Sequence, residues 1–173
     1  ISLALDNLGV DYIEGGWPGA NPTDTEFFNK KYSFNHSILT AFGMTKKTDH
    51  SAENDPMISS LINSKANSIC LFGKSWDFHV DVALGISKDQ NLTNIRESAK
   101  HIVNSGKEFM FDAEHFFDGY KSNKEYALSC IKSAYDAGAR WVVLCDTNGG
   151  TLPHEISEIV TDVSKHIPGR NLG

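Results

Sequence analysis

The sequence predicts an α/β fold built from repeated βα units. Five short apolar runs, at residues 12–16, 38–43, 68–73, 108–114 and 141–147, have the length and composition of β-strands. The segments between them carry apolar residues at the three- and four-residue spacing of amphipathic helices. Successive runs begin 26 to 40 residues apart, a spacing that suits strands alternating with helices.

The apolar runs have the pattern of strands in a parallel sheet. The runs around Phe72 and Val143 are largely apolar and do not alternate cleanly with polar residues. Strands that are buried on both faces show this pattern, and parallel sheets are usually covered by helices on both faces.

The predicted helices are marked by apolar stripes and by helix-ending residues. The segment 123–138 places one apolar face on a helix that Gly138 can end. A second stripe, over 92–103, is closed by Gly106, and a third follows Pro153, at a favoured first-turn position. Shorter helices are predicted at 24–31 and 56–64, and the end of another at 1–8.

Composition excludes several classes of protein. The 173 residues are 40% hydrophobic and 22% charged, which fits a single globular domain. The net charge of −6 predicts no binding to nucleic acid or to an anionic membrane. The apolar runs are far shorter than the roughly 20 residues of a membrane span.

The cysteines and the chain ends carry further expectations. There are three cysteines and no C-x-x-C pair, so we expect neither a disulfide framework nor a cysteine-based zinc site. A cytoplasmic location is the simplest expectation, since no signal peptide is visible. The chain begins at Ile1 and stops at Gly173 just after a predicted helix. We therefore expect it to be a piece of a longer protein.

The strand and helix pattern leaves the architecture open. Repeated βα units occur in open doubly wound sheets and in closed eight-stranded barrels. The glycine-rich segment 15–19 does not match G-x-G-x-x-G, and no P-loop motif occurs. The pattern alone does not choose between the two architectures.

Polar residues collect where the predicted strands end. Glu14 lies in the first run, and Asp112 and Glu114 end the fourth. At positions i and i+2, the last two carboxylates point to the same face of a strand. The carboxyl ends of parallel strands form the active-site edge of α/β folds, and a carboxylate among apolar residues needs a partner or a metal. These residues therefore predict a shared polar site.

Other polar residues near that edge have two interpretations each. Asp146 and Asn148, next to two glycines, are either site residues or turn formers. Lys74, Asp77 and His79 follow the third run and are interpreted as loop residues. For Glu14 as well, an ion pair beneath the loops is an alternative to a role in a site.

His115 is the obvious lone candidate for a metal ligand in this region, since histidine is a common one. It would point to the opposite face of the strand from Glu114, so we do not expect it to bind a metal. We expect Phe116, Phe117 and the cysteines to be packing residues.

Four segments together resemble the citramalate synthases, a branch of the isopropylmalate/homocitrate synthase family of transferases. They are Tyr-Ile-Glu-Gly-Gly-Trp-Pro-Gly at 12–19, Phe-Gly-Lys-Ser-Trp-Asp-Phe-His-Val at 72–80, Asp-Ala-Glu-His-Phe-Phe-Asp-Gly-Tyr at 112–120, and Leu-Cys-Asp-Thr-Asn-Gly-Gly-Thr-Leu-Pro at 144–153. Their order and spacing are compatible with the family over essentially the whole chain.

The resemblance implies a partial (β/α)₈ barrel that comprises about strands 2–6 with their helices. Residues 1–173 would then form a single incomplete catalytic domain of the pyruvate carboxyltransferase type, without strand 1 and strands 7–8. The family's Arg-Asp-Gly and His-x-His-Asn-Asp motifs lie on strands 1 and 7, so no metal ligand is expected in this chain. The full-length parent would be a cytoplasmic homodimer that binds a divalent ion (Mg, Mn or Zn), and this piece alone would be inactive.

The resemblance also implies the reaction and the roles of five residues. The family condenses acetyl-CoA with pyruvate to give (R)-citramalate and coenzyme A. Glu114 matches the glutamate that handles the methyl proton, and Thr147 the threonine that binds the keto-acid carboxylate. Glu14 would organise the substrate or the family arginine, Asp146 would position neighbouring groups, and Leu71 would wall the pocket for the pyruvate methyl.

Other functions remain compatible with the sequence. One methylene gives only about 1–3 kcal/mol of discrimination, so isopropylmalate and homocitrate synthases are close alternatives. A retro-aldol lyase of the HMG-CoA lyase type would share the barrel and the metal. A non-catalytic fragment or binding module, with open sheet edges that invite pairing, is a third possibility.

Overall fold

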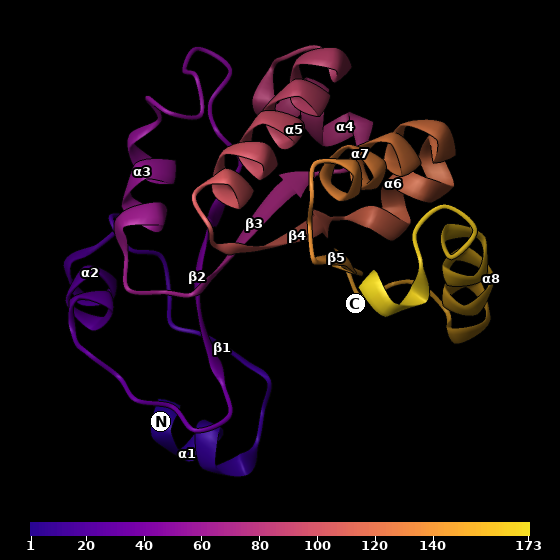
Figure 1. Cartoon of the computed structure of the whole chain (residues 1–173). Coiled ribbons are helices and arrows are strands. Elements are labelled where there is room, and N and C mark those ends of the chain that lie inside the picture. The colour runs from indigo at the N-terminus through magenta and orange to yellow at the C-terminus, as the bar shows by residue number, and fades with distance from the viewer.

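The computed structural model describes residues 1–173 and contains one five-stranded sheet. The strands are β1 Tyr12–Glu14, β2 Ile38–Met44, β3 Ser68–Lys74, β4 Glu108–Glu114 and β5 Trp141–Leu144. All neighbouring pairs are parallel, and the strand order follows the chain. The sheet curls into a half-barrel with helices outside it (Figure 1). The predicted partial (β/α)₈ barrel is therefore confirmed.

Helices connect the strands and cover the outer face. The six main ones are α1 Ser2–Leu8, α2 Pro22–Asn29, α3 Pro56–Asn63, α5 Lys88–Asn104, α7 Lys124–Asp136 and α8 Pro153–Val163. Proline occupies the first turn of α2, α3 and α8, where its missing N–H costs nothing. Helix α5 begins with a capping box formed by Ser87 and Gln90.

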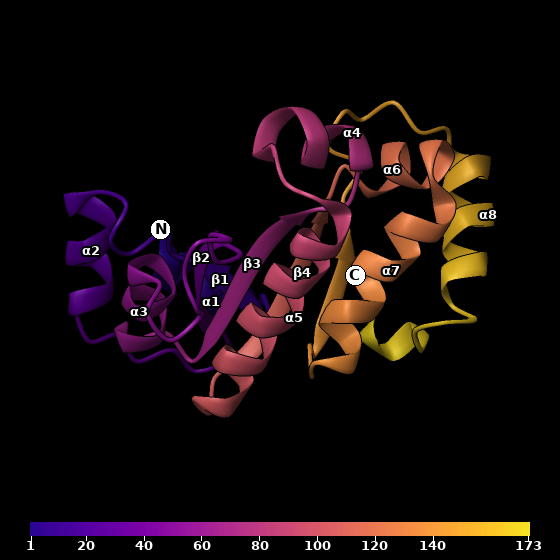
Figure 2. The ribbon, with the colours of Figure 1, turned by 90° about the horizontal axis from the view of Figure 1, so that it is seen from above.

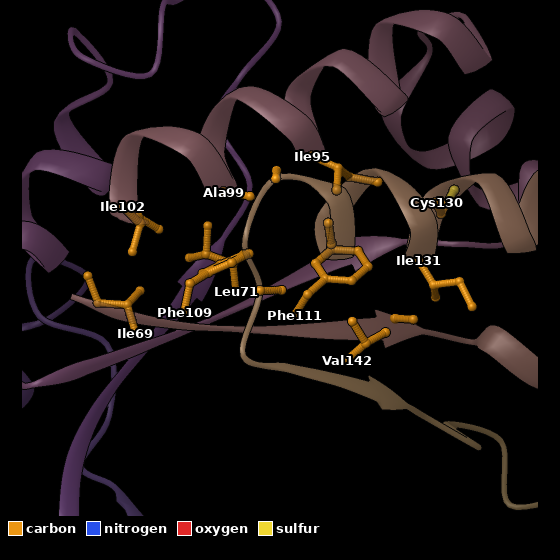
Figure 3. Close-up of a cluster of buried hydrophobic side chains, with 14 of the residues drawn as sticks. Ile69, Leu71, Ile95, Ala99, Ile102, Phe109, Phe111, Cys130, Ile131 and Val142 are labelled. Carbon is orange, nitrogen blue, oxygen red and sulfur yellow. The ribbon is translucent and has the colours of Figure 1, made fainter. Parts of the chain in front are cut away.

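The main core lies between the sheet and helices α5 and α7. Alternate residues of the strands point to these helices, and Figure 3 shows them packed beneath α5 and α7. Burying each such side chain contributes about 1.5–3 kcal/mol. The labelled members of this layer are Ile69, Leu71, Ile95, Ala99, Ile102, Phe109, Phe111, Cys130, Ile131 and Val142, and all are fully or almost fully buried.

Hydrogen bonds link the first strand to the fourth and fifth across the concave face. The Tyr12 hydroxyl donates to a Glu108 carboxylate oxygen at 2.7 Å and accepts from Trp141 Nε1 at 2.9 Å. These three residues lie near the amino ends of β1, β4 and β5. Their network therefore connects the two sides of the curved sheet at the end opposite the predicted site.

The structure shortens two predicted strands. The fifth strand was expected to reach residue 147, but β5 ends at Leu144 because residues 146–151 form a turn held by side-chain hydrogen bonds. The first ends at Glu14 rather than at residue 16. At Gly16 φ is +119°, a left-handed value that turns the chain away from the sheet.

Four short helical segments were not predicted. They are α4 Asp77–His79, the π-helical turn Val80–Leu84, α6 Phe116–Ser122 and the 3₁₀ turn Gly169–Asn171. Each is too short to show a helical period in the sequence. Figure 2 shows α4 and α6 standing near each other above the carboxyl ends of the strands. Phe116 and Phe117 of α6 are buried, as expected of packing residues.

All three cysteines are free thiols. No helix has both the length and the apolar composition that crossing a bilayer requires.

Gly119 allows α6 to approach the end of β3. A Cβ added there would lie 2.9 Å from the Cα of Trp76 and closer still to the carbonyl oxygen of Ser75. Backbone atoms cannot rotate away as a flexible side chain can. We therefore expect Gly119→Ala to lower the free energy of unfolding by about 1–3 kcal/mol, although alanine is the better helix former.

Urea denaturation of the full-length gene product measures this effect. Gly150→Ala is the matched control, because a Cβ at Gly150 meets nothing within 4 Å and its φ is not in the left-handed region. The control should change the free energy of unfolding by less than about 0.5 kcal/mol. Equal effects of the two substitutions would contradict the close approach of α6.

Candidate functional site

The carboxyl ends of the strands bring the chemistry-bearing side chains to one edge. The register pairs Phe72 with Asp112 and Lys74 with Glu114. In a parallel sheet, paired residues lie on the same face, and alternate residues share it. Cys70, Phe72 and Lys74 of β3 therefore share the concave face with Asp112 and Glu114 of β4.

Glu14, Cys70 and Asp112 form an acidic group on this face. One ligand atom of each lies within 4.8 Å of the others. Burial raises the pKa of Asp112, and burial together with the charge of Asp112 raises that of Glu14. Burial and the two carboxylates raise the pKa of the Cys70 thiol far above its ordinary value. The group thus carries negative charge that favours a bound proton or cation.

This acidic group offers donors of the types that divalent ions use. Carboxylate oxygens suit Mg²⁺ and Mn²⁺, whereas a thiolate suits Zn²⁺. The raised pKa of Cys70 favours its neutral thiol, so the two carboxylates are the more suitable donors. The sequence interpretation had placed every metal ligand outside this chain. Within this chain, Glu14 and Asp112 are the carboxylates on the concave face that could hold such an ion.

Glu114 is held by Lys74, the last residue of β3, and by Ser75, which follows it. Lys74 Nζ forms an ion pair with Glu114 Oε2, and the two side chains are 19% and 25% exposed. Ser75 binds the Glu114 carbonyl oxygen twice, through its N–H at 3.2 Å and its hydroxyl at 2.7 Å. Both the backbone and the carboxylate of Glu114 are therefore fixed at the edge of the sheet.

Thr147 contacts His115, the residue that follows Glu114. Its Oγ1 accepts a hydrogen bond from the backbone N–H of His115 at 2.9 Å. His115 has a φ of +54°, the only positive value at a non-glycine residue, and this conformation turns the chain from β4 into α6. Thr147 Oγ1 acts here only as an acceptor, so its own hydroxyl hydrogen is free to donate elsewhere.

The His115 ring lies among polar and aromatic groups of the neighbouring loops. It meets the His79 ring edge-on, with 4.4 Å between centroids, and its Nδ1 is 3.3 Å from Asp118 Oδ2. Asn148 donates to the same Asp118 oxygen at 2.9 Å. His115 thus links the β4–α6 junction to the β5–α8 loop.

Asp146 shapes the loop that carries Thr147. Its carboxylate accepts from the N–H of Thr151 at 3.1 Å and from the Thr151 hydroxyl at 2.9 Å. Its carbonyl accepts from the N–H of Gly149 at 2.8 Å. These contacts agree with the interpretation of Asp146 as a turn former. The loop that they hold also carries Thr147, so Asp146 lies close to the site.

The pKa of the Cys145 thiol indicates that three carboxylates of the site lie in one region of the molecule. Its pKa is raised to about 12, first by burial and then by the charges of Asp112, Glu114 and Glu14. All three carboxylates therefore act on one thiol just beyond the end of β5. The structure brings Glu14, Glu114 and Thr147 to the same edge of the sheet.

Leu71 does not belong to this edge. It is completely buried and lies on the helix-facing side of β3, with Ile95 and Phe111 (Figure 3). This placement corrects the expectation that Leu71 walls a substrate pocket, because its neighbour Cys70 occupies the concave face. Leu71 is a core residue.

The apolar wall on the concave face is aromatic instead. Phe72 stacks on Phe42 with 5.5 Å between centroids, and Trp17 meets both rings edge-on at 6.1 and 6.2 Å. The sequence interpretation missed these residues. No signal in the sequence marked Phe72, because the apolar run that contains it does not alternate with polar residues.

Comparison with known proteins identifies the family. The HMGL-like family model matches residues 1–172. The chain belongs to the HMGL-like family. Two relatives are named (R)-citramalate synthase: that of Aquifex aeolicus is 50% identical over 100% of this chain, and that of Sulfolobus acidocaldarius is 50% identical over 96%. A 2-isopropylmalate synthase of Caldanaerobacter subterraneus is 27% identical over 97% of the chain and 41% of its own length.

Coverage and fold complete the comparison. The chain spans about a third of the length of the citramalate synthases it matches, 33% and 32% for the first two. The solved hydroxymethylglutaryl-CoA lyase from Pseudomonas aeruginosa has a TM-score of 0.77 at 15% identity, over 99% of this chain and 58% of the lyase. That similarity supports the fold.

The position of Leu71 gives a direct test. We expect Leu71→Ala to lower the free energy of unfolding by about 2–5 kcal/mol, because it leaves a cavity among fully buried side chains. Leu152→Ala is the control, since Leu152 is an exposed leucine. Denaturant unfolding of the full-length gene product measures both, and a Leu71→Ala variant that loses no more stability than Leu152→Ala would contradict this core position.

Proposed function

We propose that this chain is the central part of the catalytic domain of a citramalate synthase. The enzyme would be an acyltransferase that joins acetyl-CoA to pyruvate and releases (R)-citramalate and coenzyme A. The observation that carries the proposal is the identity of 42–50% to five curated (R)-citramalate synthases over nearly the whole chain. Identity to 2-isopropylmalate synthases is 27–28%, which favours pyruvate over bulkier keto acids.

Glu114 would handle the proton of the acetyl methyl group. Its carboxylate takes the proton, directly or through one water, and the electron pair of the broken C–H bond forms the enolate. The enolate carbon then bonds to the keto carbon of pyruvate, and the electron pair of the broken C=O π bond moves to the keto oxygen, which takes up a proton from water. Hydrolysis of the thioester by a water molecule releases coenzyme A. A positioned carboxylate at the edge of the barrel supports this role, since a general base must reach the proton that it removes.

Thr147 would bind the carboxylate of the keto acid. The bond that it accepts from His115 N–H leaves its hydroxyl hydrogen available for a negatively charged oxygen. Hydrogen bonds to charged groups are the stronger ones, with net contributions of about 1.5–3 kcal/mol. Glu14 and Asp146 support the site, Glu14 from the acidic group and Asp146 through the loop that it holds.

The family resemblance also implies a divalent metal ion, which would polarise the keto carbonyl as a Lewis acid when bound. Glu14 and Asp112 are the residues of this chain that could contribute to holding it. The Phe42–Phe72 pair supplies an apolar surface on the same face for the methyl group of pyruvate. A cytoplasmic location and a homodimeric parent belong to the same proposal.

A free-thiol assay of the full-length gene product tests the reaction. Acetyl-CoA with pyruvate should release coenzyme A, and 2-oxoisovalerate or 2-oxoglutarate should release much less. Chelation should abolish the activity, and Mg²⁺, Mn²⁺ or Zn²⁺ should restore it. Cleavage of 3-hydroxy-3-methylglutaryl-CoA without condensation would instead identify a lyase, and absence of both reactions would defeat the proposal.

Glu114→Gln should lower kcat by about 10²- to 10⁴-fold, because it removes the proton acceptor while keeping the shape. Glu155→Gln is the control, because it makes the same chemical change in the first turn of α8, outside the concave face of the sheet. The same thiol assay measures both variants. Full activity of Glu114→Gln would exclude Glu114 as the proton-handling residue.

Thr147→Val removes the hydroxyl and keeps the shape of the side chain. We expect it to lower kcat/KM for pyruvate by roughly 10- to 100-fold, the loss of one hydrogen bond to a charged group. Thr147→Ser should retain most of the activity, since the serine hydroxyl can donate in the same way. An equal loss in both variants would show that the hydroxyl is not the group that matters.

A further inference from the structure

Lys74 is a charged residue of the site to which neither the sequence interpretation nor the proposed reaction gives a role. It is the last residue of β3, and the register places it directly beside Glu114 on β4. The ion pair between them is partly sheltered, with side chains 19% and 25% exposed. Removing two charges from water offsets much of their mutual attraction, so stability alone does not account for this ion pair.

The backbone of Lys74 is anchored in the core. Its carbonyl oxygen accepts from Asn91 Nδ2 at 2.8 Å and from the Cys130 thiol at 3.7 Å. Asn91 and Cys130 are completely buried, and Asn91 also donates to the Tyr126 hydroxyl at 2.8 Å. This network fixes the end of β3 from the helix side while the Lys74 side chain points to the concave face.

The Lys74 side chain is also confined. Its Nζ lies 5.6 Å from the centroid of the Phe72 ring, a cation–π distance, while it contacts Glu114 Oε2. Because Nζ pairs with one of the two carboxylate oxygens, the Glu114 side chain is kept in one orientation.

We infer that Lys74 is a positioning residue for Glu114, holding carboxylate Oε2 so that Oε1 is the oxygen that faces the acetyl methyl group. This inference rests on the proposed function. The methyl proton goes to Oε1, the C–H electron pair stays on carbon as the enolate, and Lys74 holds Oε2 and exchanges no proton. Misplacing a reacting group by about 1 Å costs on the order of 10²-fold in rate.

Kinetics of Lys74 variants in the full-length gene product test the inference. Lys74→Met, which keeps the length and removes the charge, should lower kcat at least about tenfold with little change in KM for pyruvate. Lys74→Arg should restore kcat to within about fivefold of the parent, because arginine also pairs with carboxylates. The matched control is Lys88→Met, since Lys88 pairs with Asp77 at 3.3 Å and does not touch Glu114; its kcat should be unchanged.

A double-mutant cycle separates positioning from a general structural effect. If Lys74 acts through Glu114, adding Lys74→Met to Glu114→Gln should lower kcat by less than about twofold. Additive losses would overturn the inference, and so would a Lys74→Met variant with the kcat of the parent. If Lys74→Met fails to fold by circular dichroism, Lys74→Arg decides: a folded arginine variant with a kcat at least about tenfold low overturns the inference.

Failure of the inference about Lys74 can be told apart from failure of the proposed function. If the parent protein releases no coenzyme A, the reaction itself is wrong. If the parent is active and the cycle is additive, the reaction stands and only the role of Lys74 falls.

Discussion

Burial of one face of each strand against the outer helices decides where the polar groups of this molecule lie. Residues such as Phe109, Phe111 and Leu71 are committed to the helix side. Because strand side chains alternate, that commitment directs Cys70, Lys74 and Glu114 to the concave face. A slip of one residue in register would exchange the two sets. The hydrophobic effect that stabilises the fold thereby also determines the geometry of the site.

Much of the fold follows from local patterns in the sequence. The apolar runs marked all five strands, and the helical stripes with their prolines and glycines marked the main helices. Segments such as α6 escaped because one or two turns carry no measurable period. The early end of β5 was not predicted because it depends on hydrogen bonds from the backbone and the hydroxyl of Thr151 to the Asp146 side chain, five residues away, which composition does not reveal.

The site was predictable only where one strand sufficed. Asp112 and Glu114 share a face because of their spacing, and that could be read from the sequence. The orientation of Leu71 could not be, since Leu71 and Cys70 both lie in an apolar run without alternation. The pairing of Lys74 with Glu114 depends on the register between two strands that are 40 residues apart in the chain. Such contacts arise only in the folded molecule.

The edge of the sheet contains carboxylates in two different electrostatic settings. Glu114 has a lysine beside it, whereas Glu14 and Asp112 lie against a buried thiol and have raised pKa values. Groups with a raised pKa in the folded state bind protons more tightly than in the unfolded chain. Their contribution to stability is therefore present at low pH and declines as the pH rises through their folded pKa. A cation near them would oppose that decline.

The Tyr12–Glu108–Trp141 network at the amino ends of the strands bears on how this fold can change in evolution. It ties the first strand to the fourth and fifth at the floor of the half-barrel, far from the residues that would touch a substrate. Hydrogen bonds thus hold the curvature of the sheet at the amino ends of its strands, and the proposed chemistry lies at the carboxyl ends. The loops at the carboxyl ends of the strands can therefore diversify in evolution without loosening the sheet that carries them.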